Sequence, residues 1–354
     1  MDAFHRIFGQ PPQASGRAPG RVNLLGEHTD YNLGLVMPLA IPRHVCVQVA
    51  RSPDGRHRFH SVQLQQDVDY EDGQPAPQGF ALYLQGCIEA LRSSGQAVPT
   101  LCVHVDSDVP IGAGLSSSAA LEVAMLRALR KLLALSIDDE AIARLAHLAE
   151  TRYAGVNCGI LDQMACSLAD TDRMLFLDTQ SMQRRLVPLP ADAAVLIIDS
   201  GQSRSLAGSG YNQRRAECEA AARLLGLASL RDLQQVPAEG TLPASLHRRA
   251  RHVFTENARV SAAAAGVDAA RFGELMNASH ASLSVDYEVS TPALDALAGV
   301  LQADPDVYGA KLTGAGFGGA CVALVKSGST RATAERVMAA FAPGHPRAAV
   351  LITG

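Results

Sequence analysis

The chain has 354 residues, of which 47% are apolar and 19% are charged, with a formal net charge of -4. A chain of this length exceeds what one hydrophobic core usually supports, so we expect two domains or one elaborate α/β domain. The charge balance is slightly acidic and no Lys/Arg cluster is interleaved with aromatic residues, which argues against a nucleic-acid partner.

The cysteines and the first residues of the chain bear on the compartment. The seven cysteines are scattered, odd in number and never in Cys-x-x-Cys spacing, which predicts buried free thiols in a reducing compartment. Residues 1–13 lack a charged start followed by an apolar run, and no apolar stretch of 18 residues follows. We therefore expect a cytoplasmic protein that does not bind membranes.

The predicted elements of the first half mix strands and helices. Residues 45–50 and 57–64 read as strands around the turn Pro53-Asp54-Gly55, which predicts a hairpin. A helical pattern over 80–93 and a strand over 101–106 follow. Helices are then expected over 118–133, 138–153 and 162–168, with Asp138 and Asp139 suited to the start of the second, and a strand over 174–178.

Pro188 and Pro190 interrupt the chain before the apolar strand 194–199, so we place a domain boundary near residue 190. The expected domains are residues 1–190 and 191–354. Beyond the boundary come helices over 211–225, 242–265 and 268–283, strands near 308–312 and 320–326, a further helix and a strand over 348–352. This order predicts an α+β fold rather than a regular βαβ series.

A loop rich in glycine and serine, PIGAGLSSSAALE at 110–122, lies between an extended stretch and a helical run. Such a loop can turn backbone N–H groups toward an anion at a helix start, where the dipole also favours negative charge. The P-loop ending Gly-Lys-Ser/Thr is absent, and Ser117 stands where a Rossmann fingerprint needs its third glycine. A helix cap or an ordinary turn is the alternative.

The segment APGRVNLLGEHTDYN at 18–32 brings four polar groups to one glycine turn: Arg21, Glu27, His28 and Asp30. Charged and imidazole groups offer donors and acceptors that recognise the hydroxyls of a small polyol. A solvated turn is the alternative interpretation.

The segment CGILDQMA at 158–165 contains Asp162 and follows Glu150, which lies near the end of the preceding predicted helix. Partial desolvation of Asp162 would favour its protonated form unless a cation opposed it, and Arg21 is the candidate cation. Glu150 and Ser118 together could offer oxygen ligands to Mg²⁺, which is usually held by one or two carboxylates plus phosphate. A helix cap for Asp162 and a surface salt bridge for Glu150 are the alternatives.

A fourth motif, KLTGAGFGGACVAL at 311–324, carries glycines at 314, 316, 318 and 319 before an apolar run. Glycines so placed indicate positive φ or a close approach of the backbone. Taken alone, the motif favours a bulge or a tight turn over a binding loop.

Together these segments resemble the signatures of the GHMP family of small-molecule kinases, which fall at 18–32, 110–120 and 311–319. Within that family the chain is similar to the galactokinases, because the first signature, VNCGILDQ, ASLSVDYEVSTPALD (281–295) and SLAGSGYNQRRAECEAA (205–221) match galactokinase-type segments. The resemblance covers nearly the whole chain. It implies a two-domain fold with mixed and antiparallel sheets flanked by helices, and an active site at the domain interface.

The resemblance implies a role for each matching residue in the transfer of the ATP γ-phosphate to the anomeric hydroxyl of D-galactose. Asp162 is the expected base and Arg21 its partner. Sugar contacts are expected from Glu27, His28, Thr29, Asp30, Gly159 and Tyr211. The phosphates are expected at Gly112, Ala113, Gly114, Leu115, Ser116, Ser117 and Ser118, Mg²⁺ at Ser118 and Glu150, and the adenine side at Ser61.

Departures from the family pattern bear on the substrate. Leu33 stands where many galactokinases carry a polar or small residue, and residues 65–80 are short and rich in proline and glutamine. A kinase for arabinose or an amino sugar is therefore the alternative, since discrimination between sugars that differ at one hydroxyl can depend on only a few hydrogen bonds. A non-catalytic galactose and ATP sensor conflicts with the intact LSSSAA run, and a mevalonate or homoserine kinase conflicts with EHTDYN. We expect a monomer.

Overall fold

The computed structural model describes residues 3–74, 78–203 and 207–353. It has the expected α+β architecture, with helices beside mixed and antiparallel sheets. Its contacts divide the chain into two compact units that interleave along the sequence. Unit 1 comprises 1–21, 40–110 and 116–168, and unit 2 comprises 22–39, 111–115 and 169–354. The boundary near residue 190 stays a prediction.

Unit 1 is built on a five-stranded sheet in the order β1-β3-β6-β4-β5. The strands are β1 (Ala14–Asn23), β3 (Pro38–Arg51), β6 (Leu101–Ser107), β4 (Arg56–Ser61) and β5 (Gln66–Glu71). The predicted hairpin of 45–50 with 57–64 is wrong, because β6 inserts between β3 and β4, antiparallel to the first and parallel to the second. The hairpin of this region joins β4 to β5 instead.

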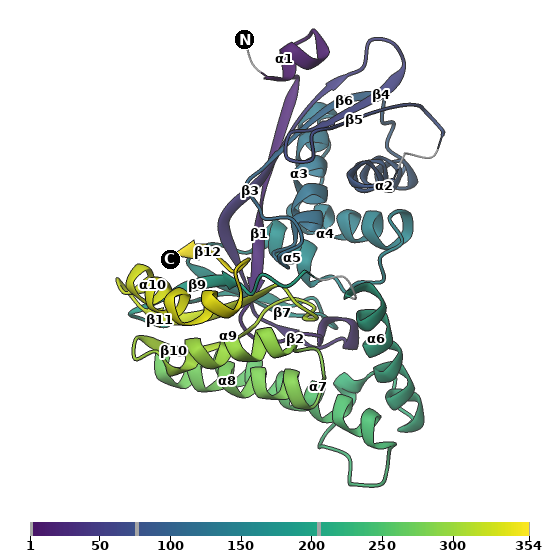
Figure 1. Cartoon of the computed structure of the whole chain (residues 1–354). Coiled ribbons are helices and arrows are strands. Elements are labelled where there is room, and N and C mark those ends of the chain that lie inside the picture. Colours follow the sequence, from purple (N-terminus) through teal and green to yellow (C-terminus); the bar gives the residue numbers. More distant parts are fainter. Residues whose placement is uncertain (1–2, 75–77, 204–206, 354) are drawn as a thin grey trace. The chain divides into compact units, whose positions relative to one another are not determined.

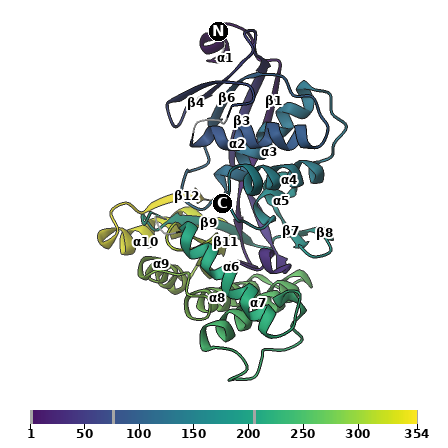
Figure 2. The same cartoon turned by 90° about the vertical axis from the view of Figure 1, so that its right-hand side faces the viewer.

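Helices cover one face of that sheet (Figures 1 and 2). They are α2 (Phe80–Ser93), α3 (Ser117–Leu132), α4 (Asp139–Leu148) and α5 (Leu161–Leu168), while α1 (Ala3–Phe8) begins the described chain. Asp138 caps α4 by accepting from the amide of Ala141, as its acidic start indicates. The helix predicted over 138–153 ends as a π-helical turn, Ala149–Tyr153, which carries Glu150.

Unit 2 contains a four-stranded sheet, β10-β11-β9-β12, and a three-stranded sheet, β2-β7-β8. The first comprises β9 (Ala193–Asp199), β10 (Val307–Leu312), β11 (Ala320–Lys326) and β12 (Ala349–Thr353), and the second β2 (Leu35–Val36), β7 (Arg173–Asp178) and β8 (Arg184–Pro188). The helices are α6 (Ala207–Leu224), α7 (Ala244–Ala264), α8 (Ala269–Val285), α9 (Pro292–Ala303) and α10 (Thr330–Phe341). Helices α8, α9 and α10 contact the four-stranded sheet (Figure 2).

The core of unit 2 joins alternate residues of β9 and β11 to the helices. Leu196 and Ile198 of β9 and Cys321 and Ala323 of β11 are all fully buried, and they cluster with residues of α6, α7, α9 and α10. Antiparallel pairing with Ile198 opposite Cys321 brings these side chains together. This packing positions the loops that begin and end at the sheet.

All seven cysteines are free, but Cys46 is exposed and Cys158 is half-buried, which corrects the prediction that the thiols are all buried. Among the described residues, no helix is both long enough and apolar enough to cross a lipid bilayer.

Candidate active site

The first signature begins in β1, and its residues from 24 onward form a loop of unit 2 between β1 and β2. Buried side chains hold the backbone of this loop. The Gly26 amide donates to Glu256 Oε1 at 2.8 Å, and the Thr29 hydroxyl contacts the carbonyls of Gly26 and Leu35 at 2.8 and 2.7 Å. Gly26 has φ 95°, and a Cβ there would lie 2.4 Å from the Leu35 carbonyl oxygen. The glycine of the motif is therefore required by both φ and space.

Glu27, an expected sugar contact, is 2% exposed and pairs with the Nζ of Lys311 at 2.5 Å. Lys311 is fully buried on β10 and also donates to the Leu312 carbonyl oxygen at 2.9 Å. A buried carboxylate needs a cation and hydrogen bonds to offset its desolvation, and Lys311 supplies the cation. The lysine that opens the third signature thus supports the first.

Glu256 of α7 holds the same loop through its hydrogen bond from the Gly26 amide. Burial raises its pKa, but the charges of Arg259, of His252 in its protonated form at low pH and of Lys311, together with the Gly26 amide, outweigh burial and lower it to about 2. The imidazole of His252 contacts the Glu27 carbonyl oxygen at 3.1 Å, and burial lowers the pKa of this ring to about 4. His252 is therefore neutral at pH 7 and donates to that carbonyl through Nε2.

His28 lies among aromatic side chains of unit 2. Its ring centroid is 5.5 Å from that of Tyr211, a residue 183 positions later in the chain and another expected sugar contact. Nδ1 of His28 lies 2.9 Å from the Tyr31 hydroxyl and Nε2 lies 3.2 Å from the carbonyl oxygen of Ala315. The fold thus brings together His28, Tyr211 and the third signature.

The serine loop ends at Ser116, the first residue of the last segment of unit 1, and the hydroxyl of this serine does not cap its helix. Gly112, Gly114 and Ser116 all have positive φ, at 80°, 86° and 58°. Ser116 occupies the N-cap position of α3, yet its side chain makes no capping bond with the described residues; it donates instead to Asp162 Oδ2 at 2.7 Å. This geometry disfavours the simple helix cap as the purpose of the serine.

Arg21 and Asp162 meet although 141 residues separate them. Arg21 Nε and Nη2 donate to Asp162 Oδ1 at 2.8 and 2.5 Å. The Arg21 side chain is 7% exposed, whereas that of Asp162 is 33% exposed, so the carboxylate remains open to solvent on one side. Asp162 lies inside the first turn of α5 and is not its cap, which removes the structural alternative for this residue.

Ser118 and Glu150 also meet, with the Ser118 hydroxyl donating to Glu150 Oε1 at 2.9 Å. Burial, and to a smaller extent the negative charge of Asp162, raises the pKa of Glu150 to about 7. Hydrogen bonds from Ser118, Cys158 and Gln163 lower this pKa but do not outweigh burial. The Gln163 amide contacts both Glu150 and Glu122, and burial raises the pKa of Glu122 well above its ordinary range. Glu150 is not a surface salt bridge.

The oxygens of Ser118 and Glu150 suit a hard divalent cation. A cation there would oppose the desolvation that now favours the protonated carboxyl. Among the described residues, no group of three or more His, Cys, Asp or Glu side chains could hold a metal ion. Two oxygen donors match the way Mg²⁺ is held, with few protein ligands and the remaining positions filled by phosphate and water.

The four glycines of the third signature all have positive φ. A Cβ on Gly316 would lie 2.3 Å from the Val289 carbonyl oxygen, and one on Gly318 would lie 2.7 Å from that of Gln202. Both reasons predicted for the glycines, positive φ and a close approach of backbone, are confirmed at Gly316 and Gly318. The backbone that comes close belongs to the same unit.

Several predicted positions gain no further support from their surroundings. Ser61 is buried in β4, opposite Gln66 of β5 and Val105 of β6, and its place at the adenine stays a prediction. Gly159 is half-buried just before α5. Leu33, the departure noted above, has φ 57° and is 40% exposed. Ser205 and Leu206 of the 205–221 motif lie outside the described residues.

Sequence reasoning missed Lys311, Tyr31, Tyr287 and Gln163 as supports of the site. Each lies inside a motif that was recognised for another reason. A lysine in an otherwise uncharged strand, VYGAKL, is the one signal that local pattern offered, because a buried lysine requires a partner.

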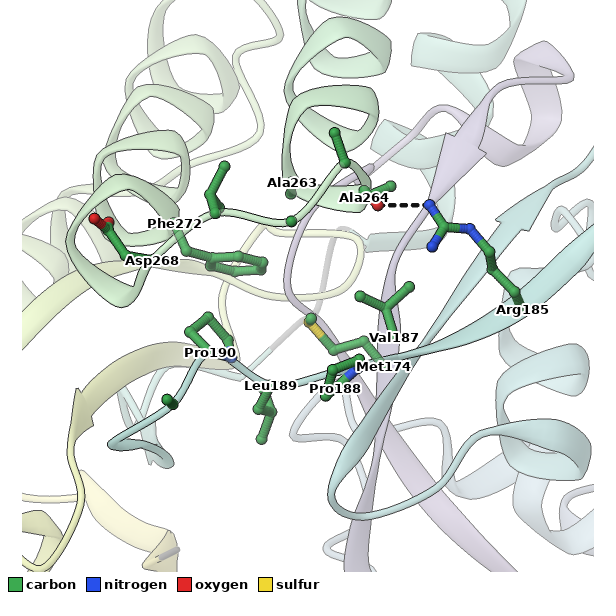
Figure 3. A pocket seen from close by; sticks show the side chains of 14 residues that line it. Met174, Arg185, Val187, Pro188, Leu189, Pro190, Ala263, Ala264, Asp268 and Phe272 are labelled. Atoms are coloured by element: carbon green, nitrogen blue, oxygen red, sulfur yellow. Dashed lines mark hydrogen bonds between the residues drawn. The ribbon is translucent and has the colours of Figure 1, made fainter.

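A cavity of about 450 Å³ lies elsewhere in unit 2, between β8, the following loop and the junction of α7 with α8 (Figure 3). Most of the residues that line it have apolar side chains, Phe272 and Pro190 among them, although backbone and charged groups also contribute to its walls. Arg185 donates to the Ala264 carbonyl oxygen at 2.5 Å and Asp268 caps α8. Its charged groups therefore serve the fold, and none of the predicted site residues is among the described residues that line it.

Three family models match the chain. The galactokinase galactose-binding signature matches residues 2–51, the GHMP kinase N-terminal domain matches 82–170 and the GHMP kinase C-terminal domain matches 261–344. A galactokinase of Roseiflexus sp. (strain RS-1) is 41% identical over 363 residues, covering 99% of this chain and 93% of the relative. A galactokinase of Streptomyces coelicolor is 38% identical over 96% of this chain and 92% of its own.

Solved structures agree with these matches. The galactokinase of Lactococcus lactis complexed with galactose superposes with a TM-score of 0.92 at 31% identity, covering 99% of this chain and 96% of that one. The mevalonate kinase of Methanococcus jannaschii, at 17% identity over 91% and 94% of the two chains, gives a TM-score of 0.68 and shares the fold. By sequence identity and by fold, the chain belongs to the galactokinases of the GHMP kinase family.

Proposed function

We propose that this protein transfers the γ-phosphoryl group of ATP to the anomeric hydroxyl of galactose, with Asp162 as the group that accepts the proton. Membership of the galactokinases supports the reaction, and the convergence of Arg21 and Ser116 on the half-open Asp162 carboxylate supports the assignment of the base. That convergence is the observation that carries the proposal.

The proton step uses the accessible side of Asp162. The sugar O–H proton passes to a carboxylate oxygen while the sugar oxygen attacks the γ-phosphorus, and ADP leaves. General-base assistance contributes about 10²–10⁴ in rate, so positioning and charge stabilisation carry the larger share. Arg21 holds Asp162 Oδ1 with two N–H groups, which fixes the carboxylate and leaves Oδ2 to the Ser116 hydroxyl or to the substrate.

The phosphates are assigned to the loop Gly112–Ser118, in which every second residue from Gly112 to Ser116 has positive φ just before the start of α3. Ser118 and Glu150 would hold Mg²⁺. The ion would neutralise charge that develops on the transferred phosphoryl group. The Ser118 hydroxyl oxygen and Glu150 Oε1 lie 2.9 Å apart, which supports this assignment.

The sugar is assigned to Glu27, His28, Thr29, Asp30 and Tyr211 of unit 2, and Gly159 stays a predicted contact. The hydrogen bonds and the ion pair that fix the first-signature loop support a rigid binding surface. A rigid surface suits recognition of hydroxyls, because hydrogen bonds discriminate by geometry. We retain the monomer and the cytoplasmic location as predictions, the first of which light scattering tests.

The test measures ADP release from MgATP with galactose, glucose, arabinose, galactosamine and N-acetylgalactosamine. We expect turnover with galactose, and Asp162→Asn should lower kcat by about 10²–10⁴ while the galactose KM changes little. Asp170→Asn is the matched control, since Asp170 pairs with Arg173 at the surface.

The outcomes separate the parts of the proposal. Preference for another sugar would overturn the substrate but keep the mechanism. Galactose binding without turnover of any sugar would favour a sensor. Near-normal turnover by Asp162→Asn would overturn the base.

A further inference from the structure

The segment Asp286–Glu288, at the end of α8, matched the family without receiving a function. Its central residue, Tyr287, is fully buried. Arg214 donates to the Tyr287 carbonyl oxygen at 2.6 Å, Arg249 lies with its guanidinium carbon 5.8 Å from the centre of the Tyr287 ring, and the His252 ring centre lies 4.3 Å away. Helices α6 and α7 thus fix this tyrosine from two sides.

The Tyr287 hydroxyl is the middle of a chain of hydrogen bonds. It lies 2.8 Å from the Tyr31 hydroxyl and 3.0 Å from the Cys218 sulfur. Tyr31 in turn lies 2.9 Å from His28 Nδ1, and His28 Nε2 lies 3.2 Å from the Ala315 carbonyl oxygen. The chain runs from α6 through the first signature to the third, entirely within unit 2.

Which atom donates in each of these hydrogen bonds follows from the last acceptor of the chain, the Ala315 carbonyl oxygen. The Ala315 carbonyl can only accept, so His28 Nε2 carries a proton, and in a neutral ring Nδ1 must then accept. Tyr31 therefore donates to His28, Tyr287 donates to Tyr31, and the Cys218 thiol donates to Tyr287. Burial raises the pKa of all three donors, that of Cys218 to about 11, so each keeps its proton at pH 7.

His28 needs the support of these hydrogen bonds because its backbone has φ 63°, in the left-handed region that residues other than glycine rarely adopt. Both ring nitrogens of His28 have hydrogen-bond partners, Tyr31 and Ala315. The Asn32 amide adds a bond to the His28 carbonyl oxygen at 2.9 Å.

We propose that the Tyr31–Tyr287 hydroxyl pair is a positioning device that holds His28 in its Nε2–H tautomer and so sets the affinity of the first-signature loop for the sugar, and not for the nucleotide. The inference rests on the assignment of the sugar to this loop. Neither tyrosine is taken to touch the substrate.

The experiment uses the full chain with Tyr31→Phe, Tyr287→Phe, the double variant and Tyr70→Phe. Each change removes one phenolic oxygen. Tyr70 is the matched control, because its buried hydroxyl has no hydrogen-bond partner among the described residues. The readouts are KM and kcat for galactose and for ATP, and the ¹⁵N resonances of the His28 ring, which report the tautomer directly.

We expect each single variant to raise the galactose KM by about 3–10-fold, the loss that one neutral hydrogen bond produces, with the ATP KM within twofold of the wild type. The double variant should resemble the worse single variant, because each single substitution already interrupts the same series of hydrogen bonds. In Tyr31→Phe the Nδ1 resonance should lose its hydrogen-bonded position. Tyr70→Phe should match the wild type in every readout.

An unchanged galactose KM in both single variants would overturn the inference, as would equal increases in both KM values. If the wild type failed to phosphorylate galactose, the proposed function would fall, and the His28 resonances would still decide whether the hydroxyl pair sets the tautomer. Unchanged His28 resonances in Tyr31→Phe would overturn the tautomer assignment whatever the kinetics.

Discussion

Replacement of Lys311 by methionine tests the buried ion pair beneath the first signature. The substitution preserves most of the side-chain volume and removes only the ammonium group. It leaves the Glu27 carboxylate, 2% exposed, without the cation that lies 2.5 Å away, and the Leu312 carbonyl loses a donor at 2.9 Å.

The expected cost follows from the burial of both partners. Removing one member of a buried ion pair typically lowers the free energy of unfolding by about 3–5 kcal/mol, because the remaining charge stays desolvated. At about 2 °C of Tm per kcal/mol for a long chain, Lys311→Met should unfold ~6–10 °C below the wild type.

Thermal unfolding of three variants separates charge from packing. Lys326→Met is the control, because the Lys326 side chain is 51% exposed and its pair with Asp306 lies at the surface; such pairs contribute about 0–1 kcal/mol. The double variant Glu27→Met/Lys311→Met should recover most of the lost Tm, since no buried charge remains.

A Tm for Lys311→Met within 2 °C of that for Lys326→Met would contradict the reasoning, where 2 °C corresponds to about 1 kcal/mol. A double variant less stable than Lys311→Met alone would contradict it as well, because the loss would then come from packing rather than from an unpaired carboxylate.

Three further predictions concern other contacts. The folded pKa of His252, about 4, lies below the ordinary 6.5, so the folded protein should lose about 2 kcal/mol relative to His252→Gln between pH 7.5 and 5, and equal pH slopes in chemical unfolding would argue against a neutral buried ring. Gly316→Ala should destabilise more than Gly328→Ala, because both have positive φ but only the first would place a Cβ against backbone; equal Tm values would refute the clash. Arg21→Lys should lower kcat about 10–100-fold with little change in Tm, since lysine cannot hold Asp162 with two donors, and full activity would show that charge alone suffices.

Much of the secondary structure could be predicted from local pattern. The helix over 80–93 begins and ends at the predicted residues, and α3, α5, β9 and β11 lie within one residue of expectation. These segments succeed because their apolar residues recur with one clear period. Helix α9 was missed despite Thr291 at its N-cap and a proline at its first position, a signal that the sequence did contain.

The failures occurred where a distant segment decides the structure. Strand β1 was not predicted, because two glycines and a proline obscure its pattern, yet Gly16 is needed there: a Cβ would lie 2.0 Å from the Ala124 carbonyl oxygen of α3. The predicted hairpin failed because β6, from 40 residues later, forms hydrogen bonds with both of its strands.

The sequence by itself determined the family and the chemical groups, because short motifs around glycine turns need particular residues at fixed spacing. Arg21, Asp162, Ser118 and Glu150 could be named for that reason. The sequence and the resemblance also predicted the pairs Arg21–Asp162 and Ser118–Glu150, which the tertiary structure shows in contact, but other contacts of the site were decided by the tertiary structure alone.

Lys311 pairs with Glu27, and Tyr287 supports His28, across more than 250 residues of chain. Such contacts leave no local period or spacing, since their energy comes from desolvation and hydrogen-bond geometry that exist only after the core has closed.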